Sequence, residues 1–315
     1  MTTQTFALLA VGVLIFALFS RRLQDRSITP PMVFGAFGLI IGQAGLGVAD
    51  FSMTEGFAHI LAELTLILVL FIDAARIDVA RLKVDHDLPV RMLAIGMPLT
   101  IILGAGAALL MFSELSIWHA LVLAAILAPT DAALGQAVVS SPQVPVRIRQ
   151  ALNVESGLND GVALPAVLLF ACFAGIAHGG PTGTAGWIQF GILQLTLGPL
   201  VGLAVGYAGA RGIDTAVSKG WMAGDFTGPA ALALALACYS LAELVGGNGF
   251  IAAFVGGLAF GVGVRDHCHS LFEFAEAEGQ LLTLIAFLLF GAVLLPEALN
   301  HLSVTVVLYA VLSLT

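Results

Sequence analysis

Charged residues are scarce in this sequence, and cysteines are few. Only 10% of the 315 residues are Asp, Glu, Lys or Arg, whereas soluble domains average about 25%. So few charges cannot cover a water-facing surface, which excludes a soluble globular enzyme. The net charge of −8 provides no basic surface, which excludes nucleic-acid binding. The cysteines Cys172, Cys238 and Cys268 are widely separated and form neither a disulfide framework nor a zinc-binding pattern.

Long apolar runs dominate the chain instead. Hydrophobic residues make up 59% of it and the mean hydropathy is +1.02. A bilayer core of about 30 Å requires roughly 20 apolar residues per helix. We therefore predict an all-α polytopic membrane protein of about eleven transmembrane helices, the last of which begins at Leu302. The other predicted spans are 3–20, 31–48, 56–75, 89–112, 117–139, 149–178, 187–210, 227–246, 249–264 and 277–299.

The 12 basic residues follow every second span. They are Arg21, Arg22, Arg26, Arg76, Arg81, Lys83, Arg91, Arg147, Arg149, Arg211, Lys219 and Arg265. Because cytoplasmic loops concentrate Lys and Arg, we predict a multi-pass protein of the bacterial inner (plasma) membrane with its N-terminus outside and its basic loops in the cytoplasm. The final segment, 302–315, would form about 21 Å of helix, too short to span. We therefore expect residues 1–315 to be a single transmembrane domain that is incomplete at its C-terminus.

Acidic side chains lie in the predicted membrane interior, which holds no Lys or Arg. These are Glu63, Asp131, Glu155, Asp160 and Glu243, with Asp73 near a cytoplasmic boundary. An unpaired carboxylate at the bilayer centre costs at least about 2.5 kcal/mol. A proton, a bound cation or a basic group from the segment expected beyond this sequence would neutralise it. Asp131 and Asp160 fall near the predicted midplane, where transporter sites typically lie. The acids therefore predict a site that handles protons and cations.

Local sequence modifies the two helices that carry Asp131 and Asp160. Pro129 has no N–H to donate, so we predict that its helix opens there and exposes carbonyl groups. The alternative is an ordinary kink. In the next span, Ser156 shares a helical face with Asp160, and Glu155 with Asn159. Hydroxyl and carboxylate oxygens are hard ligands that suit a small cation. The alternative here is a polar network that only holds helices together.

These residues resemble the electroneutral branch of the cation/proton antiporters, which includes bacterial NhaP and animal NHE exchangers. The resemblance covers essentially the whole chain and is strongest in "APTD" at 128–131 and "NVESGLNDGVALP" at 153–165. It implies an inverted-repeat antiporter fold with a discontinuous helix, two further helices beyond this sequence, and a homodimer in the lipid bilayer. It implies no cofactor beyond the transported Na⁺ and H⁺.

The same resemblance implies roles for individual residues. Asp160 exchanges H⁺ and Na⁺, and Ser156 and Thr130 help to hold the metal ion. Asn159, where electrogenic relatives have a second Asp, implies electroneutral exchange. The remaining implied roles are that Glu155 pairs with an Arg from a later helix and that Asp73 lies close to the site. The alternative for Asp73 is an ion pair with Arg76. Asp131 is expected either to fix the opened backbone or to assist ion entry.

The resulting hypothesis is secondary active transport, not an enzymatic reaction. Asp160 binds either H⁺ or Na⁺ (or Li⁺), and alternating access makes the exchange obligatory. The nearest alternative is a K⁺/H⁺ antiporter of the same fold. Passive channels are a second alternative, and an intramembrane aspartyl protease is a remote one, because no Tyr-Asp pair occurs.

Several residues have simpler interpretations. Glu63 is predicted to be a satisfied interior acid and Glu243 an entrance residue near the outer face. His267, Cys268 and His269 are predicted to lie in a solvated loop. Two glycine series allow close contact between helices, within the molecule or in a homodimer. They are Gly198, Gly202 and Gly206, and Gly257 and Gly261.

Overall fold

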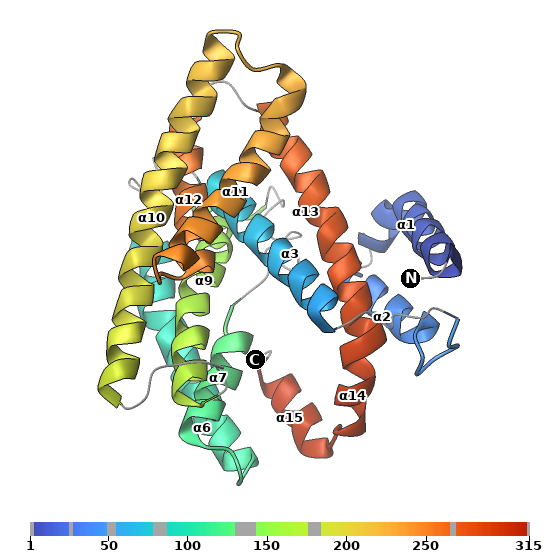
Figure 1. Cartoon of the computed structure of the whole chain (residues 1–315). Coiled ribbons are helices and arrows are strands. Elements are labelled where there is room, and N and C mark those ends of the chain that lie inside the picture. The colour runs from blue at the N-terminus through green and yellow to red at the C-terminus, as the bar shows by residue number, and fades with distance from the viewer. Residues whose placement is uncertain are drawn as a thin grey trace. The chain divides into compact units, whose positions relative to one another are not determined.

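The computed structural model describes residues 3–24, 28–48, 55–77, 87–129, 143–175, 184–264 and 269–313. Every regular element in these ranges is helical (Figure 1). The elements are α1 (Thr3–Gln24), α2 (Pro30–Ile41), α3 (Glu55–Arg76), α5 (Asp87–Arg91), η1 (Met92–Gly96), α6 (Met97–Met111), α7 (Ile117–Leu127), α9 (Val146–Phe173), α10 (Thr184–Ser218), η2 (Gly224–Phe226), α11 (Thr227–Leu244), α12 (Gly249–Gly263), α13 (His269–Leu289), η3 (Phe290–Leu294), α14 (Leu295–Asn300) and α15 (Val304–Leu312).

The helices confirm the predicted all-α class. Among the described residues, four helical stretches are long and apolar enough to cross a membrane. They are Met92–Met111, Ile192–Ser218, Gly224–Leu244 and Gly279–Asn300. Shorter apolar helices are Pro30–Ile41, Ile117–Leu127, Ala163–Phe173 and Gly249–Gly263. The outward side chains of the long stretches are apolar too: Leu110 is 90% exposed, Leu103 64% and Leu200 61%. An apolar exterior of this kind suits lipid rather than water.

The second predicted span is shorter than expected. We predicted 31–48, but α2 ends at Ile41 and residues 42–48 form a turn. The Leu46 amide donates to the Ile40 carbonyl at 2.7 Å, and Gly47 has a φ of 62°. This conformation ends helices and favours glycine, because a side chain is strained there. The glycines at 42, 45 and 47 are therefore a stop signal inside an apolar run.

The chain divides into two compact units, residues 1–66 with 276–304 and residues 67–275 with 305–315. In the first unit, Phe34 of α2 is 1% exposed and packs edge-on against Phe16 of α1, with ring centroids 5.3 Å apart. Leu288 at the end of α13 completes this core. Gly38 of α2 lies directly against the Leu288 carbonyl, so the two helices meet backbone to backbone.

In the second unit, α12 is packed through small residues on two faces. A Cβ on Gly206 of α10 would lie 2.5 Å from the carbonyl oxygen of Gly256 in α12. On another face, Gly257 and Gly261 lie against the main chain of α3 at Phe71 and Ala75. Such close backbone approach is possible only without side chains. These described glycines therefore serve packing within one chain, which confirms the internal interpretation of the glycine series.

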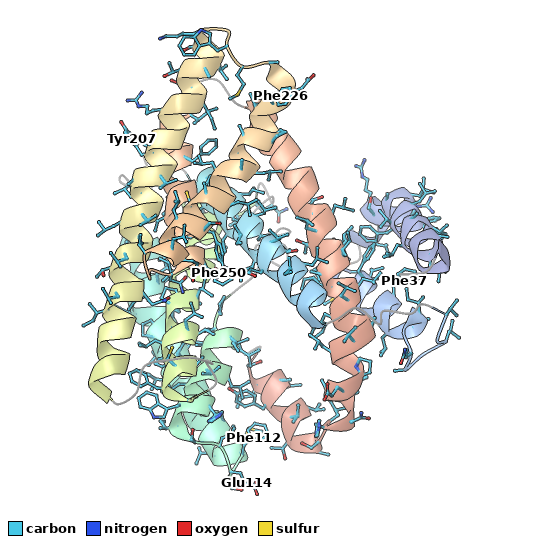
Figure 2. The ribbon with its side chains drawn as sticks, viewed as in Figure 1. Phe37, Phe112, Glu114, Tyr207, Phe226 and Phe250 are labelled. Atoms are coloured by element: carbon cyan, nitrogen blue, oxygen red, sulfur yellow. The ribbon has the colours of Figure 1, made fainter. Side chains whose placement is uncertain are left out.

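Aromatic side chains lie in the second half of α10 and in the connection to α11. Tyr207 projects from α10 and is 46% exposed, and Phe226, just before α11, is 65% exposed (Figure 2). The Arg211 Nε donates to the Tyr207 hydroxyl at 3.2 Å, and the Lys219 ammonium lies 4.7 Å from the Trp221 ring centroid. Aromatic rings beside basic side chains are typical of membrane–water interfaces.

Candidate functional site

Helix α9 carries the polar face predicted from the sequence. It runs without interruption through Glu155, Ser156, Asn159 and Asp160. Asn159 is only 1% exposed, and its Nδ2 donates to Glu155 Oε1 at 3.5 Å. These two residues therefore share a face one turn apart, as the spacing predicts. Ser156 and Asp160 have the same spacing on α9; their side chains lie outside the described residues.

Sequence reasoning did not single out Pro165, which lies inside α9. Proline has no N–H, so the helical hydrogen bond from residue 165 to the carbonyl of Gly161 cannot form. Gly161 directly follows Asp160. The helical hydrogen bonding of α9 is therefore weakened within one turn of the predicted ion-binding carboxylate. A proline within an apolar run is the sequence signal that could have identified this position.

Helix α7 runs from Ile117 to Leu127, and the hydroxyl of the preceding Ser116 caps it by accepting from the His119 amide at 3.4 Å. Ala128 and Pro129 follow without helical structure. Proline at this position cannot donate the next helical hydrogen bond. Thr130 and Asp131, which complete the "APTD" motif, lie outside the described residues.

Helices α7 and α9 pack against each other in opposite directions. Trp118 near the start of α7 stacks on Phe173 at the end of α9, with ring centroids 4.7 Å apart. Helices rise about 1.5 Å per residue, so Leu127, nine residues beyond Trp118, is level with Leu164, nine residues before Phe173. The end of α7 therefore lies about one turn along α9 from Asp160.

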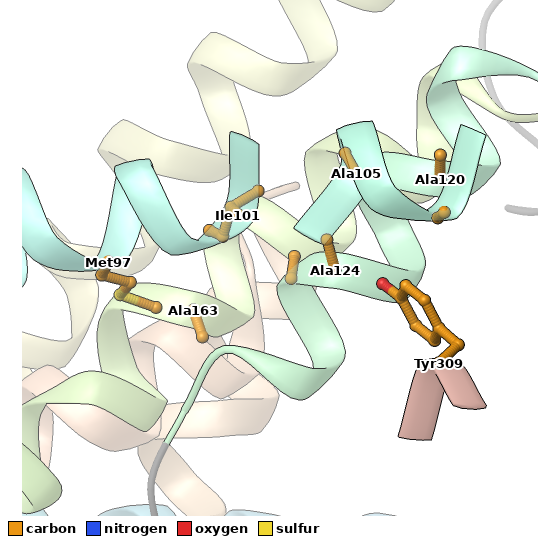
Figure 3. Packing of buried hydrophobic residues seen from close by; sticks show 9 residues of the cluster. Met97, Ile101, Ala105, Ala120, Ala124, Ala163 and Tyr309 are labelled. Carbon is orange, nitrogen blue, oxygen red and sulfur yellow. The ribbon is translucent and has the colours of Figure 1, made fainter. Parts of the chain in front are cut away.

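A hydrophobic core of mostly small side chains and one tyrosine packs α6, α7 and α9 together. Figure 3 shows residues of α6, α7 and α9 interlocking there, together with Tyr309 of α15. The buried members are Met97, Ile101, Ala105, Ala108, Ala120, Ala124, Ala125, Ala163 and Tyr309. Alanines at the crossing allow α7 to lie close to α9, which fixes the two helices that carry the predicted site.

Asp73 lies on α3 and is half-buried. Its neighbours Leu70 and Ala74 pack with Phe254 of α12, and Leu164 of α9 joins the same cluster. The cluster that includes these α3 residues therefore reaches α9 about one turn from Asp160. The side chain of Arg76, the alternative partner predicted for Asp73, lies outside the described residues.

Two other acids have defined positions. Glu243 at the end of α11 accepts from the Gly249 amide at 2.7 Å, and Asn248 accepts from the Ile251 amide at 2.9 Å. Both side chains thus satisfy amides at the first turn of α12. The entrance role expected of Glu243 stays a prediction. Glu63 is half-buried on α3. In the predicted histidine–cysteine cluster, residues 267 and 268 lie outside the described part of the chain.

An all-helical fold with an apolar exterior and a buried polar face on α9 defines a multi-pass membrane protein. Residues 7–315 match the family model described as "Sodium/hydrogen exchanger, transmembrane". The chain therefore belongs to the sodium/hydrogen exchanger family.

Individual relatives agree with this assignment. The chain is 27% identical over 303 residues to the K(+)/H(+) antiporter NhaP of Alkalimonas amylolytica, covering 94% of this chain and 51% of that protein. It is 30% identical over 268 residues to the Na(+)/H(+) antiporter ApNhaP of Aphanothece halophytica, covering 80% and 48%. The chain thus spans about half the length of these relatives.

A solved structure has a similar fold. The sodium proton antiporter MjNhaP1 from Methanocaldococcus jannaschii superposes with a TM-score of 0.73 at 18% identity, covering 91% of this chain and 72% of that chain. This similarity confirms the antiporter fold predicted from the sequence.

Proposed function

We propose that the protein exchanges Na⁺ (or Li⁺) for H⁺ across the membrane by alternating access, with no net movement of charge. Family membership over residues 7–315 supports antiport as the class of activity. The polar face of α9 carries the proposal: Asn159, immediately before Asp160, is 1% exposed in a 28-residue helix. Buried polar groups in the middle of a membrane helix are expected to be functional.

In this proposal Asp160 is one carboxylate that binds either H⁺ or a cation. A bare carboxylate is strongly disfavoured in a low-dielectric interior. Either ion removes that charge, so the loaded site can change its exposure from one side of the membrane to the other while the empty site cannot. Because both ions occupy the same carboxylate, movement of one in each direction becomes obligatory.

Ser156 and Thr130 are proposed to complete the cation site with Asp160. Ser156 lies one turn before Asp160 on α9, and Thr130 follows the end of α7. Because α7 ends about one turn along α9 from Asp160, Thr130 can lie close to Ser156 and Asp160. Hydroxyl and carboxylate oxygens are the hard ligands that alkali cations prefer. Asp131 and Asp73 are proposed to act nearby, in cation entry or in holding the opened backbone.

Asn159 is proposed to make the exchange electroneutral. Its amide donates to Glu155, so it organises the polar face without carrying a second proton. One titrating carboxylate then moves one H⁺ for each cation. Imposing a membrane potential on proteoliposomes should leave the exchange rate unchanged, and a rate that follows the potential would contradict this stoichiometry.

K⁺/H⁺ antiport is the second candidate, because the relatives carry both names. NhaP of Alkalimonas amylolytica is named a K(+)/H(+) antiporter and ApNhaP a Na(+)/H(+) antiporter. The ligand types proposed here accept either ion. Titrating Li⁺, Na⁺ and K⁺ against dissipation of an imposed pH gradient decides between them: half-maximal response at the lowest concentration with Na⁺ or Li⁺ supports the first proposal, and with K⁺ the second.

The assignment of Asp160 is tested in proteoliposomes of the full-length protein. Asp160→Asn should abolish cation-dependent proton flux. The matched control is Asp225→Asn, which removes an exposed carboxylate in η2 and should retain wild-type flux. Normal flux in Asp160→Asn would refute the assignment.

The protein is further proposed to be a homodimer in the bacterial inner membrane with its N-terminus outside. The alternation of basic connections along the sequence supports this orientation. Labelling of single cysteines introduced at Lys219 and at Glu114 with an impermeant maleimide tests it. Glu114 should react from outside intact cells and Lys219 only after the membrane is opened.

A further inference from the structure

The hydroxyl of Tyr309 makes a contact that links distant parts of the sequence. Tyr309 lies in α15, is 5% exposed, and donates from its hydroxyl to the main-chain carbonyl of Gly104 in α6 at 3.1 Å. Its ring packs edge-on against Phe112, with centroids 5.6 Å apart. The ring thus supplies apolar packing, and the hydroxyl supplies one polar bond between α15 and α6.

Gly104 lies where α6 crosses α7. A Cβ at this position would lie 3.1 Å from the Cβ of Ala124 and 3.7 Å from the Tyr309 hydroxyl. Three helices therefore meet at one glycine, and its carbonyl is the acceptor for Tyr309. Gly106 lies on the same helix, and a Cβ there would have no neighbour within 4 Å.

This meeting point belongs to the core that packs together the two helices of the proposed ion site. Ala124 is three residues before Leu127, the last residue of α7. Ala163, in the same core, is three residues after Asp160 on α9. Figure 3 shows the hydroxyl end of Tyr309 directed toward Ala124. Because α6 packs along α7 and α7 packs along α9, a shift of α6 at Gly104 would displace α7 beside α9.

We propose that Tyr309 is a positioning residue for the ion site: its bond to Gly104 fixes α6, and α7 packs against α6, so the end of α7 keeps its distance from Asp160. Tyr309 itself does not touch the ion. This inference rests on the proposed function and extends it to a residue outside both sequence motifs. Cation ligands bind well only when their supporting residues are fixed.

The test compares variants of the full-length protein in proteoliposomes. Tyr309→Phe removes the hydroxyl and keeps the ring, so the core stays filled. We expect its apparent KM for the cation to rise about threefold, the factor that corresponds to an average hydrogen bond between membrane helices. The maximal rate per folded molecule should stay at the wild-type value. Tyr207→Phe, on the exposed side of α10, is the matched control and should leave the KM unchanged.

A second pair tests the same point from α6. Gly104→Ala inserts a methyl group at the α6–α7 contact and should also raise the KM, whereas Gly106→Ala should not. For every variant the cation concentration that half-maximally stabilises the purified protein against heating should shift with the KM, because ligand binding stabilises the folded state. This readout does not depend on transport.

The possible failures are distinguishable. An unchanged KM and stabilisation midpoint in Tyr309→Phe, with only less folded protein, would show that Tyr309 has a structural role alone and would overturn the inference. Absence of cation-dependent flux in the wild-type protein would overturn the proposed function, and the inference with it.

Discussion

Replacing Gly206 with alanine should destabilise the packing of α10 on α12. The new Cβ would lie 2.5 Å from the carbonyl oxygen and 2.6 Å from the Cα of Gly256. Ordinary contacts of this kind begin at 3.4 Å, so the two helices must separate by about 1 Å at this point. No flexible side chain can move aside, because both neighbouring atoms belong to the backbone.

The size of the effect follows from comparison with Gly212, on the same helix. A Cβ at Gly212 would have no neighbour within 4 Å. Both substitutions gain the same helix propensity, about 1 kcal/mol, and this gain cancels in the difference between the variants. The difference is therefore the overpacking cost, about 1–3 kcal/mol, and should fall at the upper end because the clash is with backbone.

Thermal unfolding of the purified variants in one detergent measures this difference. Gly206→Ala should unfold several degrees below Gly212→Ala, given a shift of about 2–4 °C per kcal/mol in domains of comparable size. Equal unfolding temperatures, or a more stable Gly206→Ala variant, would refute the backbone-to-backbone contact between α10 and α12.

Two further predictions concern the other side of this packing. Asn248→Ala should lower the unfolding temperature, because losing an N-cap costs about 0.5–2 kcal/mol and the bond that the Asn248 amide donates to Gln194 at 2.9 Å is lost as well. Asn248→Asp keeps the accepting oxygen but not this donor, so it should recover only part of the loss. Cys238 is 0% exposed; with Cys172 and Cys268 replaced by alanine, a maleimide should label it only after denaturation. Rapid labelling of the folded protein would show that α11 and α12 are packed differently.

The helices and the polar face of α9 could be predicted because their signals are local. Apolar runs report directly on membrane helices, and residues four apart on one helix must share a face. The contact between Asn159 and Glu155 follows from that spacing alone. The closely spaced glycines after Ile41 are a local signal for the end of α2. The span was predicted from the length of the apolar run, and glycines do not interrupt such a run.

Contacts between distant segments could not be predicted in this way. Tyr309 and Gly104 are 205 residues apart, and nothing near either residue indicates the other. The glycine series on α10 predicts that another helix approaches closely, but not that this helix is α12. Such partners are set by how the helices pack, so a glycine pattern in one sequence favours close packing within the chain without identifying the partner helix.

Proton release on cation binding is the most direct test of competition at Asp160. The purified full-length protein is placed in weakly buffered detergent solution with a pH indicator, and Na⁺ is added. Competition for one carboxylate predicts that each bound cation releases up to one proton, with none released from Asp160→Asn. Cation binding without proton release in the wild-type protein, across the pH range in which it transports, would contradict a shared site.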